Sequence, residues 1–166
     1  MGTETPFNLN DETGTYSILR PISANEILHQ AELILEAQFR PGTKIQSPAN
    51  TEKFLRSKLA HFEYEVFCAI YLTNRHSIIK FEKLFNGTVD RTSVYPREVV
   101  KKALQLNAAA VIIAHNHPSW EGEPSQADER ITRRLKSALE LVDIRTLDHI
   151  VVAGTNMVSM AASGLV

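Results

Sequence analysis

Two short runs in the sequence are apolar at every position, and they constrain the fold more than any other feature. The first follows Glu65 and extends to Leu72, and the second extends from Ala108 to Ala114. A strand exposed on one face alternates apolar and polar residues, whereas a strand covered on both faces is apolar throughout. Both runs are therefore predicted to be strands that are covered on both faces.

Helical and extended segments alternate along the rest of the chain. Capping residues and apolar periodicity predict helices over residues 23–39, 47–60 and 96–107 and along the apolar stripe 131–142. Further strands are predicted over residues 78–85, 149–153 and 157–160, whereas residues 1–22 are expected to be mostly loop or a poorly ordered tail. This alternation predicts an α/β sandwich in which helices flank a mixed sheet.

The length of 166 residues, of which 43% are hydrophobic, suits one core and is short for two. We expect an N-terminal tail and amphipathic helix over residues 1–45 and one catalytic domain over residues 46–166. With 18 basic and 19 acidic residues, the net charge of -1 produces no long-range field that would attract a polyanion. Nucleic acid is therefore an unfavoured partner, and the sequence leaves a homo-oligomer open.

The single cysteine, Cys68, lies in the first apolar run and has no second cysteine to pair with. A buried thiol in a reducing compartment is the simplest interpretation. The sequence contains no apolar stretch of about 20 residues, which a membrane-spanning helix needs. Its first residues also lack the basic and apolar regions of a signal peptide. We therefore expect a cytoplasmic protein without a membrane anchor.

Two histidines, His115 and His117, directly follow the second apolar run. An extended backbone points residues i and i+2 to the same side, so both imidazoles can bind one metal ion. Ser125 and Asp128 complete the spacing His-x-His-x7-Ser-x-x-Asp, which offers two nitrogens and one oxygen to a metal such as zinc. Three protein ligands leave a fourth position open to water, as in catalytic zinc sites.

Each part of this pattern has an ordinary alternative. A His-x-His pair at a strand end can be a surface or hydrogen-bonded pair, and Ser-x-x-Asp is also a helix capping box with Ser125 as the N-cap. The helical periodicity favours the metal, because it places Asp128 on the same stripe as Ile131 and Leu135. A carboxylate on a buried stripe needs a partner.

A proton acceptor and an oxyanion donor would complete a hydrolytic site. Glu65 shares its parity with Phe67 at the start of the first apolar run and is the candidate base, while Glu63 and Glu82 remain rivals. Ser125 can cap its helix and still direct its hydroxyl toward a developing oxyanion. His149 is interpreted as a core histidine, with the orientation of a metal ligand as the alternative.

The span from Glu65 to about Gly154 resembles a known family, the RadC family of the JAB/MPN group of metallopeptidases with the JAMM motif. The stretches that carry the resemblance are Tyr95–Lys101, Asn107–Ala110, His115–Ser119 and Leu147–His149. The resemblance implies a cytidine-deaminase-like fold, a three-layer α/β/α sandwich. It also implies a Zn2+ ion bound by His115, His117 and Asp128, with Ser125 supporting the oxyanion and Glu65 as the catalytic glutamate.

The resemblance implies a zinc-dependent hydrolase that cleaves a peptide or isopeptide amide, so we expect a peptide or protein substrate. The alternatives are a non-catalytic metal-binding scaffold and an accessory protein associated with DNA repair. One position departs from the family. Where the family usually has glycine after the His-Pro-Ser run, this chain has Trp120 at the mouth of the expected site.

Overall fold

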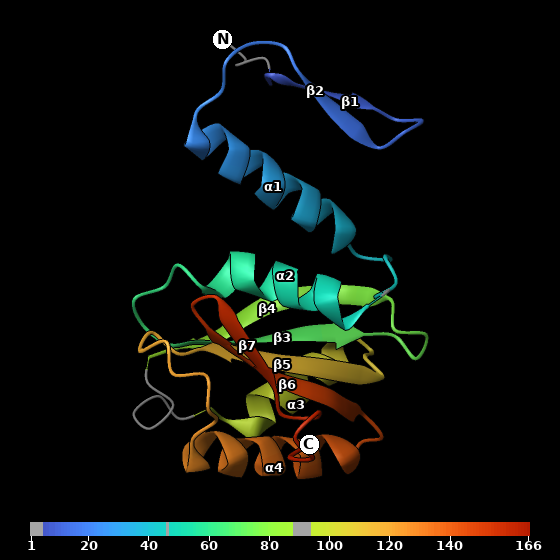
Figure 1. Ribbon diagram of the computed structural model, residues 1–166. Coiled ribbons are helices and arrows are strands. Elements are labelled where there is room, and N and C mark those ends of the chain that lie inside the picture. The colour runs from blue at the N-terminus through green and yellow to red at the C-terminus, as the bar shows by residue number, and fades with distance from the viewer. Residues whose placement is uncertain (1–4, 46, 88–93) are drawn as a thin grey trace. The chain divides into compact units, whose positions relative to one another are not determined.

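The computed structural model describes residues 5–45, 47–87 and 94–166, which form two compact units, residues 1–38 and 39–166 (Figure 1). The first unit contains strands β1 (Phe7–Asn10) and β2 (Thr15–Ile18) and helix α1 (Ala24–Gln38). The two strands form an antiparallel hairpin. The prediction of loop over most of residues 1–22 is therefore wrong for these eight residues, because the short strands carry too little apolar alternation to be recognised.

The predicted capping box opens α1. Ser23 N–H donates to the Glu26 carboxylate at 2.8 Å, and Glu26 N–H donates back to Ser23 Oγ at 3.3 Å. Each end of the helix lies within one residue of the predicted bounds, but none of its residues is buried.

The described part of the second unit contains a sheet and three helices. Its elements are α2 (Pro48–Leu59), β3 (Val66–Leu72), β4 (Ile78–Asn86), α3 (Pro96–Gln105), β5 (Ala110–Asn116), α4 (Gln126–Glu140), β6 (Arg145–Ala153) and β7 (Asn156–Ser159). The strand order is β4-β3-β5-β6-β7, with β5 and β6 parallel and the other pairs antiparallel. Helix α2 lies on one face of the sheet, and α3 and α4 lie on the other (Figure 1). The predicted three-layer α/β/α sandwich with a mixed sheet is confirmed.

Strands β3 and β5 lie side by side in the middle of the sheet, and every residue of both strands is buried. This confirms the interpretation of the two apolar runs as strands covered on both faces. Alternate residues of β3 and β5, among them Phe67 and Ile113, pack with the apolar faces of α3 and α4 in one core cluster. Cys68 is buried in the same sheet, as expected.

Strand β5 extends further than predicted. The second apolar run predicts a strand that ends at Ala114, but His115 also pairs with Phe67 of β3 and with Val151 of β6. The neighbouring strands extend the ladder past the last apolar residue, which apolar patterning alone does not reveal.

Among the described residues, no helix combines the length and apolar character that crossing a bilayer requires.

Candidate metal centre

The end of β5 directs consecutive side chains to opposite faces of the sheet. His115 is fully buried, and the partly buried His117 is held by its own N–H, which donates to the carbonyl oxygen of Val152 at 2.8 Å. Asn116, between the two histidines, is buried and hydrogen-bonds to the first residue of β3, Val66, and to Tyr64 just before it. The two imidazoles therefore share one side of the strand, as the sequence predicted.

The beginning of α4 brings the third candidate ligand to this point. Ser125 is the N-cap, and its hydroxyl oxygen accepts from Asp128 N–H at 3.2 Å. In return, Asp128 Oδ2 accepts from the Ser125 N–H and from the Ser125 hydroxyl, each at 2.7 Å. This is the predicted capping box. Asp128 is only 1% exposed, as its position on the apolar stripe predicted.

The three side chains converge on one point. The Nε2 atoms of His115 and His117 are 2.9 Å apart. Asp128 Oδ1 lies 3.1 Å from His115 Nε2, and Oδ2 lies 3.4 Å from His117 Nε2. Tetrahedral zinc with bonds of about 2.0–2.1 Å would separate its ligand atoms by about 3.3 Å. The three residues therefore form a group that can hold a metal ion.

The chemistry of the donor set fits a cation. His117 Nδ1–H donates to the carbonyl oxygen of Glu121 at 2.7 Å, so its Nε2 lone pair points toward the other two side chains. Asp128 Oδ1 is buried and accepts no hydrogen bond, although it lies close to His115. Buried acceptors that face one another without a donor are costly, and a bound cation satisfies all of them.

The pKa values of Asp128 and His117 are shifted in opposite directions, and each shift favours the charged form of its group. Burial alone would raise the pKa of Asp128, but contacts with His115, His117 and Ser125 outweigh it and hold this pKa well below its usual range. Asp128 in turn raises the pKa of His117, although partial burial opposes this shift. The aspartate is therefore ionised and ready to bind a cation.

Two further buried residues lie behind His115. His149 of β6 places its Nε2 2.8 Å from His115 Nδ1, and its own Nδ1 lies 2.5 Å from Thr132 Oγ1 of α4. Burial lowers the pKa of His149 well below its ordinary value. Sequence analysis does not identify Thr132, because nothing in its spacing relates it to the histidines.

A cavity of about 450 Å³ opens beside the three ligands and is lined by Glu65, His117, Ser125 and Asp128. The structure thus brings the predicted base and the predicted oxyanion serine to the candidate metal centre. The rivals of Glu65 lie elsewhere. Glu63 is exposed and does not line this cavity, and Glu82 pairs with Lys102 at 3.0 Å on β4.

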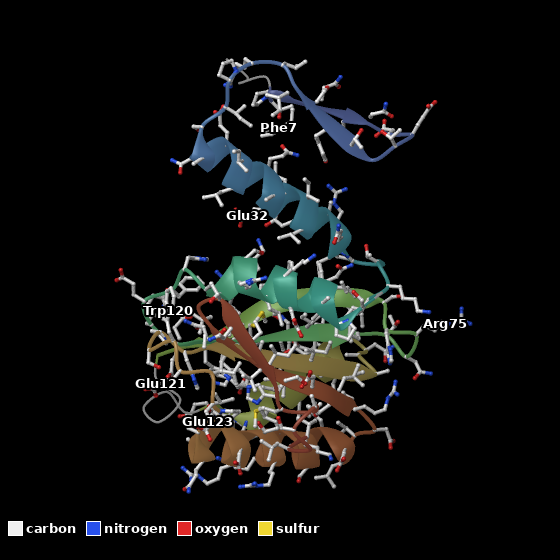
Figure 2. All side chains as sticks on the ribbon, in the orientation of Figure 1. Phe7, Glu32, Arg75, Trp120, Glu121 and Glu123 are labelled. Atoms are coloured by element: carbon white, nitrogen blue, oxygen red, sulfur yellow. The ribbon has the colours of Figure 1, made fainter. Side chains whose placement is uncertain are left out.

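The loop between β5 and α4 forms the rim of this cavity. Figure 2 shows the side chains of Trp120, Glu121 and Glu123 on this loop. The two glutamates line the cavity, whereas Trp120 does not. Trp120 is 65% exposed and packs over Gly154 in the β6–β7 turn, where an added Cβ would come within 2.6 Å of its Cδ2.

Comparison with known proteins identifies the family to which the C-terminal unit is similar. The family model of the RadC-like JAB domain matches residues 45–165. A UPF0758 protein of Vibrio cholerae serotype O1 is 56% identical over 140 residues, which is 84% of this chain and 88% of that protein. A second UPF0758 protein of the same organism is 50% identical over 147 residues, or 89% of this chain and 94% of that protein. A UPF0758 protein of Marinobacter nauticus is 51% identical over 138 residues, which is 83% of this chain and only 62% of that protein.

Proposed function

Because the chain belongs to the RadC-like JAB domain family, we propose that it is a zinc-dependent metallopeptidase that cleaves a peptide or isopeptide amide. One observation carries this proposal. Three buried or half-buried donor groups, from His115, His117 and Asp128, converge beside an open cavity that also contains a glutamate and a serine. A purely structural zinc site would have four protein ligands and no adjoining cavity.

His115 and His117 would hold the metal through Nε2, and Asp128 would hold it through its carboxylate. When bound, zinc supplies a Lewis acid that polarises the amide carbonyl and activates a water molecule. The buried surroundings strengthen this effect, because charges interact more strongly where water is excluded.

Glu65 is the proposed general base. It lines the cavity beside His117, where it can accept a proton from the attacking water and return it to the departing amine. Ser125 lies at the same cavity and is the proposed oxyanion donor. Its hydroxyl proton is directed to Asp128 Oδ2, so it must turn toward the substrate as the oxyanion forms.

The charges of the cavity favour a substrate with a basic group beside the cleaved amide. Among the described residues that line it, Glu65, Glu121, Glu123 and Asp128 are acidic, and Arg130 is the single lysine or arginine. Such a site attracts a lysine or arginine side chain and repels a phosphodiester backbone. This argues against the alternative role in DNA repair at this cavity.

The buried, unpaired Cys68 suits a reducing compartment, so we place this activity in the cytoplasm.

The test combines metal analysis of the purified protein with cleavage of a peptide library. We expect about one zinc ion per chain, and loss of cleavage after chelation. Glu65→Gln should lower kcat by about 100- to 10,000-fold while the zinc content is unchanged. Glu63→Gln is the matched control, because Glu63 precedes Glu65 by two residues but is exposed outside the cavity.

The main alternative is a metal-binding scaffold without catalysis. A protein that carries zinc but cleaves no amide in the library would support this alternative. A protein that cleaves amides equally well after Glu65→Gln and after Glu63→Gln would contradict the role of Glu65.

A further inference from the structure

A chain of buried hydrogen bonds behind His115 is not used in the function proposed above. It begins at the backbone carbonyl of Asp128, passes through the hydroxyl of Thr132 and the ring of His149, and ends at Nδ1 of His115. All three side chains, Thr132, His149 and His115, are 0% exposed. Bulk water therefore cannot replace a hydrogen-bond partner that one of these side chains loses.

The position of the protons follows from the first contact. Thr132 Oγ1 lies 2.6 Å from the carbonyl oxygen of Asp128, which has no proton to offer. The single hydroxyl proton of Thr132 must therefore point to that carbonyl, since two oxygens at this distance repel each other without a proton between them. The sulfur of Met160, 3.7 Å from the hydroxyl, is a weaker acceptor. The hydroxyl oxygen is thus left to accept a hydrogen bond from His149.

The two rings then follow in order. His149 carries its proton on Nδ1 and donates it to Thr132, so its Nε2 has a free lone pair. That lone pair accepts from His115, which therefore carries its own proton on Nδ1. The Nε2 atom of His115 is left unprotonated and faces His117 and Asp128. With the opposite direction of donation, His115 would carry a proton on Nε2 and could not bind a metal there.

We propose that Thr132 and His149 are positioning residues that fix the ring tautomer of His115, so that its Nε2 lone pair is presented to the metal. This inference rests on the zinc site proposed above. His117 needs no such chain, because the backbone carbonyl of Glu121 fixes its tautomer directly. The helix that supplies Asp128 also supplies Thr132 one turn later, so one element sets both a ligand and the tautomer of another.

The first test locates the ring protons. Protein labelled with 15N in histidine is examined by long-range 1H–15N correlation, which distinguishes protonated from unprotonated ring nitrogens. We expect His149 to be neutral with its proton on Nδ1, both with and without zinc, and His115 to carry its proton on Nδ1 when zinc is bound. A proton on Nε2 of His149 would overturn the proposal without any variant being needed.

The second test uses variants and zinc affinity. Thr132→Val has nearly the same shape but no hydroxyl, and it should displace the proton of His149 from Nδ1 and weaken zinc binding by about 10- to 100-fold. Thr132→Ser retains the hydroxyl and should preserve both the tautomer and the affinity. Likewise, His149→Gln offers an amide oxygen to His115 and should bind zinc more tightly than His149→Leu.

These measurements are independent of amide cleavage. A wild-type protein that binds zinc but cleaves no peptide would contradict the proposed peptidase activity. The positions of the ring protons of His149 and His115 would still decide the positioning role. Unchanged tautomers and unchanged zinc affinity in folded Thr132→Val would show that the hydrogen bonds of Thr132 and His149 serve packing alone. The positioning role would then be wrong.

Discussion

The side-chain oxygen of Asn116 accepts a hydrogen bond from the backbone N–H of Val66 at 2.7 Å. The amide group of the same side chain donates to the carbonyl oxygens of Tyr64 at 3.0 Å and Phe62 at 3.3 Å. Asn116 stands between the two candidate histidine ligands, and Glu65 stands between Tyr64 and Val66. One buried side chain therefore ties the strand of the candidate metal ligands to the segment of the proposed base.

The first prediction concerns this link. Asn116→Ala leaves one buried N–H and two carbonyl groups without their partner. We therefore expect the free energy of unfolding to fall by about 1–3 kcal/mol. Because Glu65 would no longer be held in place, kcat should fall by about 100-fold, while the zinc content stays the same. Denaturant unfolding, metal analysis and peptide cleavage measure the three quantities.

Asn116→Asp is the informative companion variant. Its carboxylate can still accept from Val66 N–H but cannot donate to the two carbonyls. The Asn116→Asp protein should therefore be no more stable than the Asn116→Ala protein. An Asn116→Ala protein that retains full activity would show that Glu65 is positioned without this side chain.

Much of this architecture is predictable because burial on both faces leaves a direct trace in the sequence. The apolar runs of β3 and β5, the two imidazoles at i and i+2, and the helical stripe that buries Asp128 all follow from periodicity. These elements together define the sheet and the candidate metal centre.

Other features depend on contacts between distant segments and leave no local pattern. Thr132 and His149 come from a helix and a strand that meet only in the folded unit. Asn116 reads as a polar residue at the start of a loop, yet its partners precede it by 50 residues or more. Such residues are recognised only when the fold is known.

The second prediction concerns the backbone at Trp120, which has a positive φ of 66°. A left-handed conformation costs a residue with a Cβ about 1–2 kcal/mol, whereas glycine adopts it freely. The greater freedom of glycine in the unfolded chain offsets about 0.4–1 kcal/mol of this difference. Trp120→Ala should therefore be less stable than Trp120→Gly by up to about 1.6 kcal/mol, since both variants lose the same packing on Gly154.

Urea unfolding of the two variants in the same buffer measures this difference directly. A more stable alanine variant would mean that residue 120 does not hold a left-handed backbone in solution.

The third prediction concerns the acidic rim. Glu123→Lys should reduce kcat/KM for peptides with lysine or arginine beside the cleaved bond and should make their cleavage less sensitive to sodium chloride. Peptides with neutral residues there should be affected much less. Glu140→Lys is the control, because it makes the same change of charge at the other end of α4. Equal losses for basic and neutral peptides would contradict an electrostatic role of the rim.

The last prediction concerns the pH dependence of zinc binding. Zinc requires an unprotonated Nε2 on His117, and Asp128 raises the pKa of this histidine above its ordinary value of 6.5 in the metal-free protein. As the pH falls through this raised pKa, a proton competes with the metal, and the affinity should fall by about tenfold per pH unit for that proton. The Asp128 carboxyl, whose pKa is lowered, stays ionised over this range and takes up no proton.

Calorimetric zinc titrations in two buffers of different ionisation enthalpy give both the affinity and the number of protons released. The decline should begin above pH 6.5, the ordinary pKa of histidine, because the neighbouring carboxylate favours the protonated ring. Asp128→Asn removes the first cause of this shift, so its weaker zinc binding should begin to decline at a lower pH. An affinity that stays constant down to pH 6 in the wild-type protein would mean that His117 is not a ligand, or that Asp128 does not act on it.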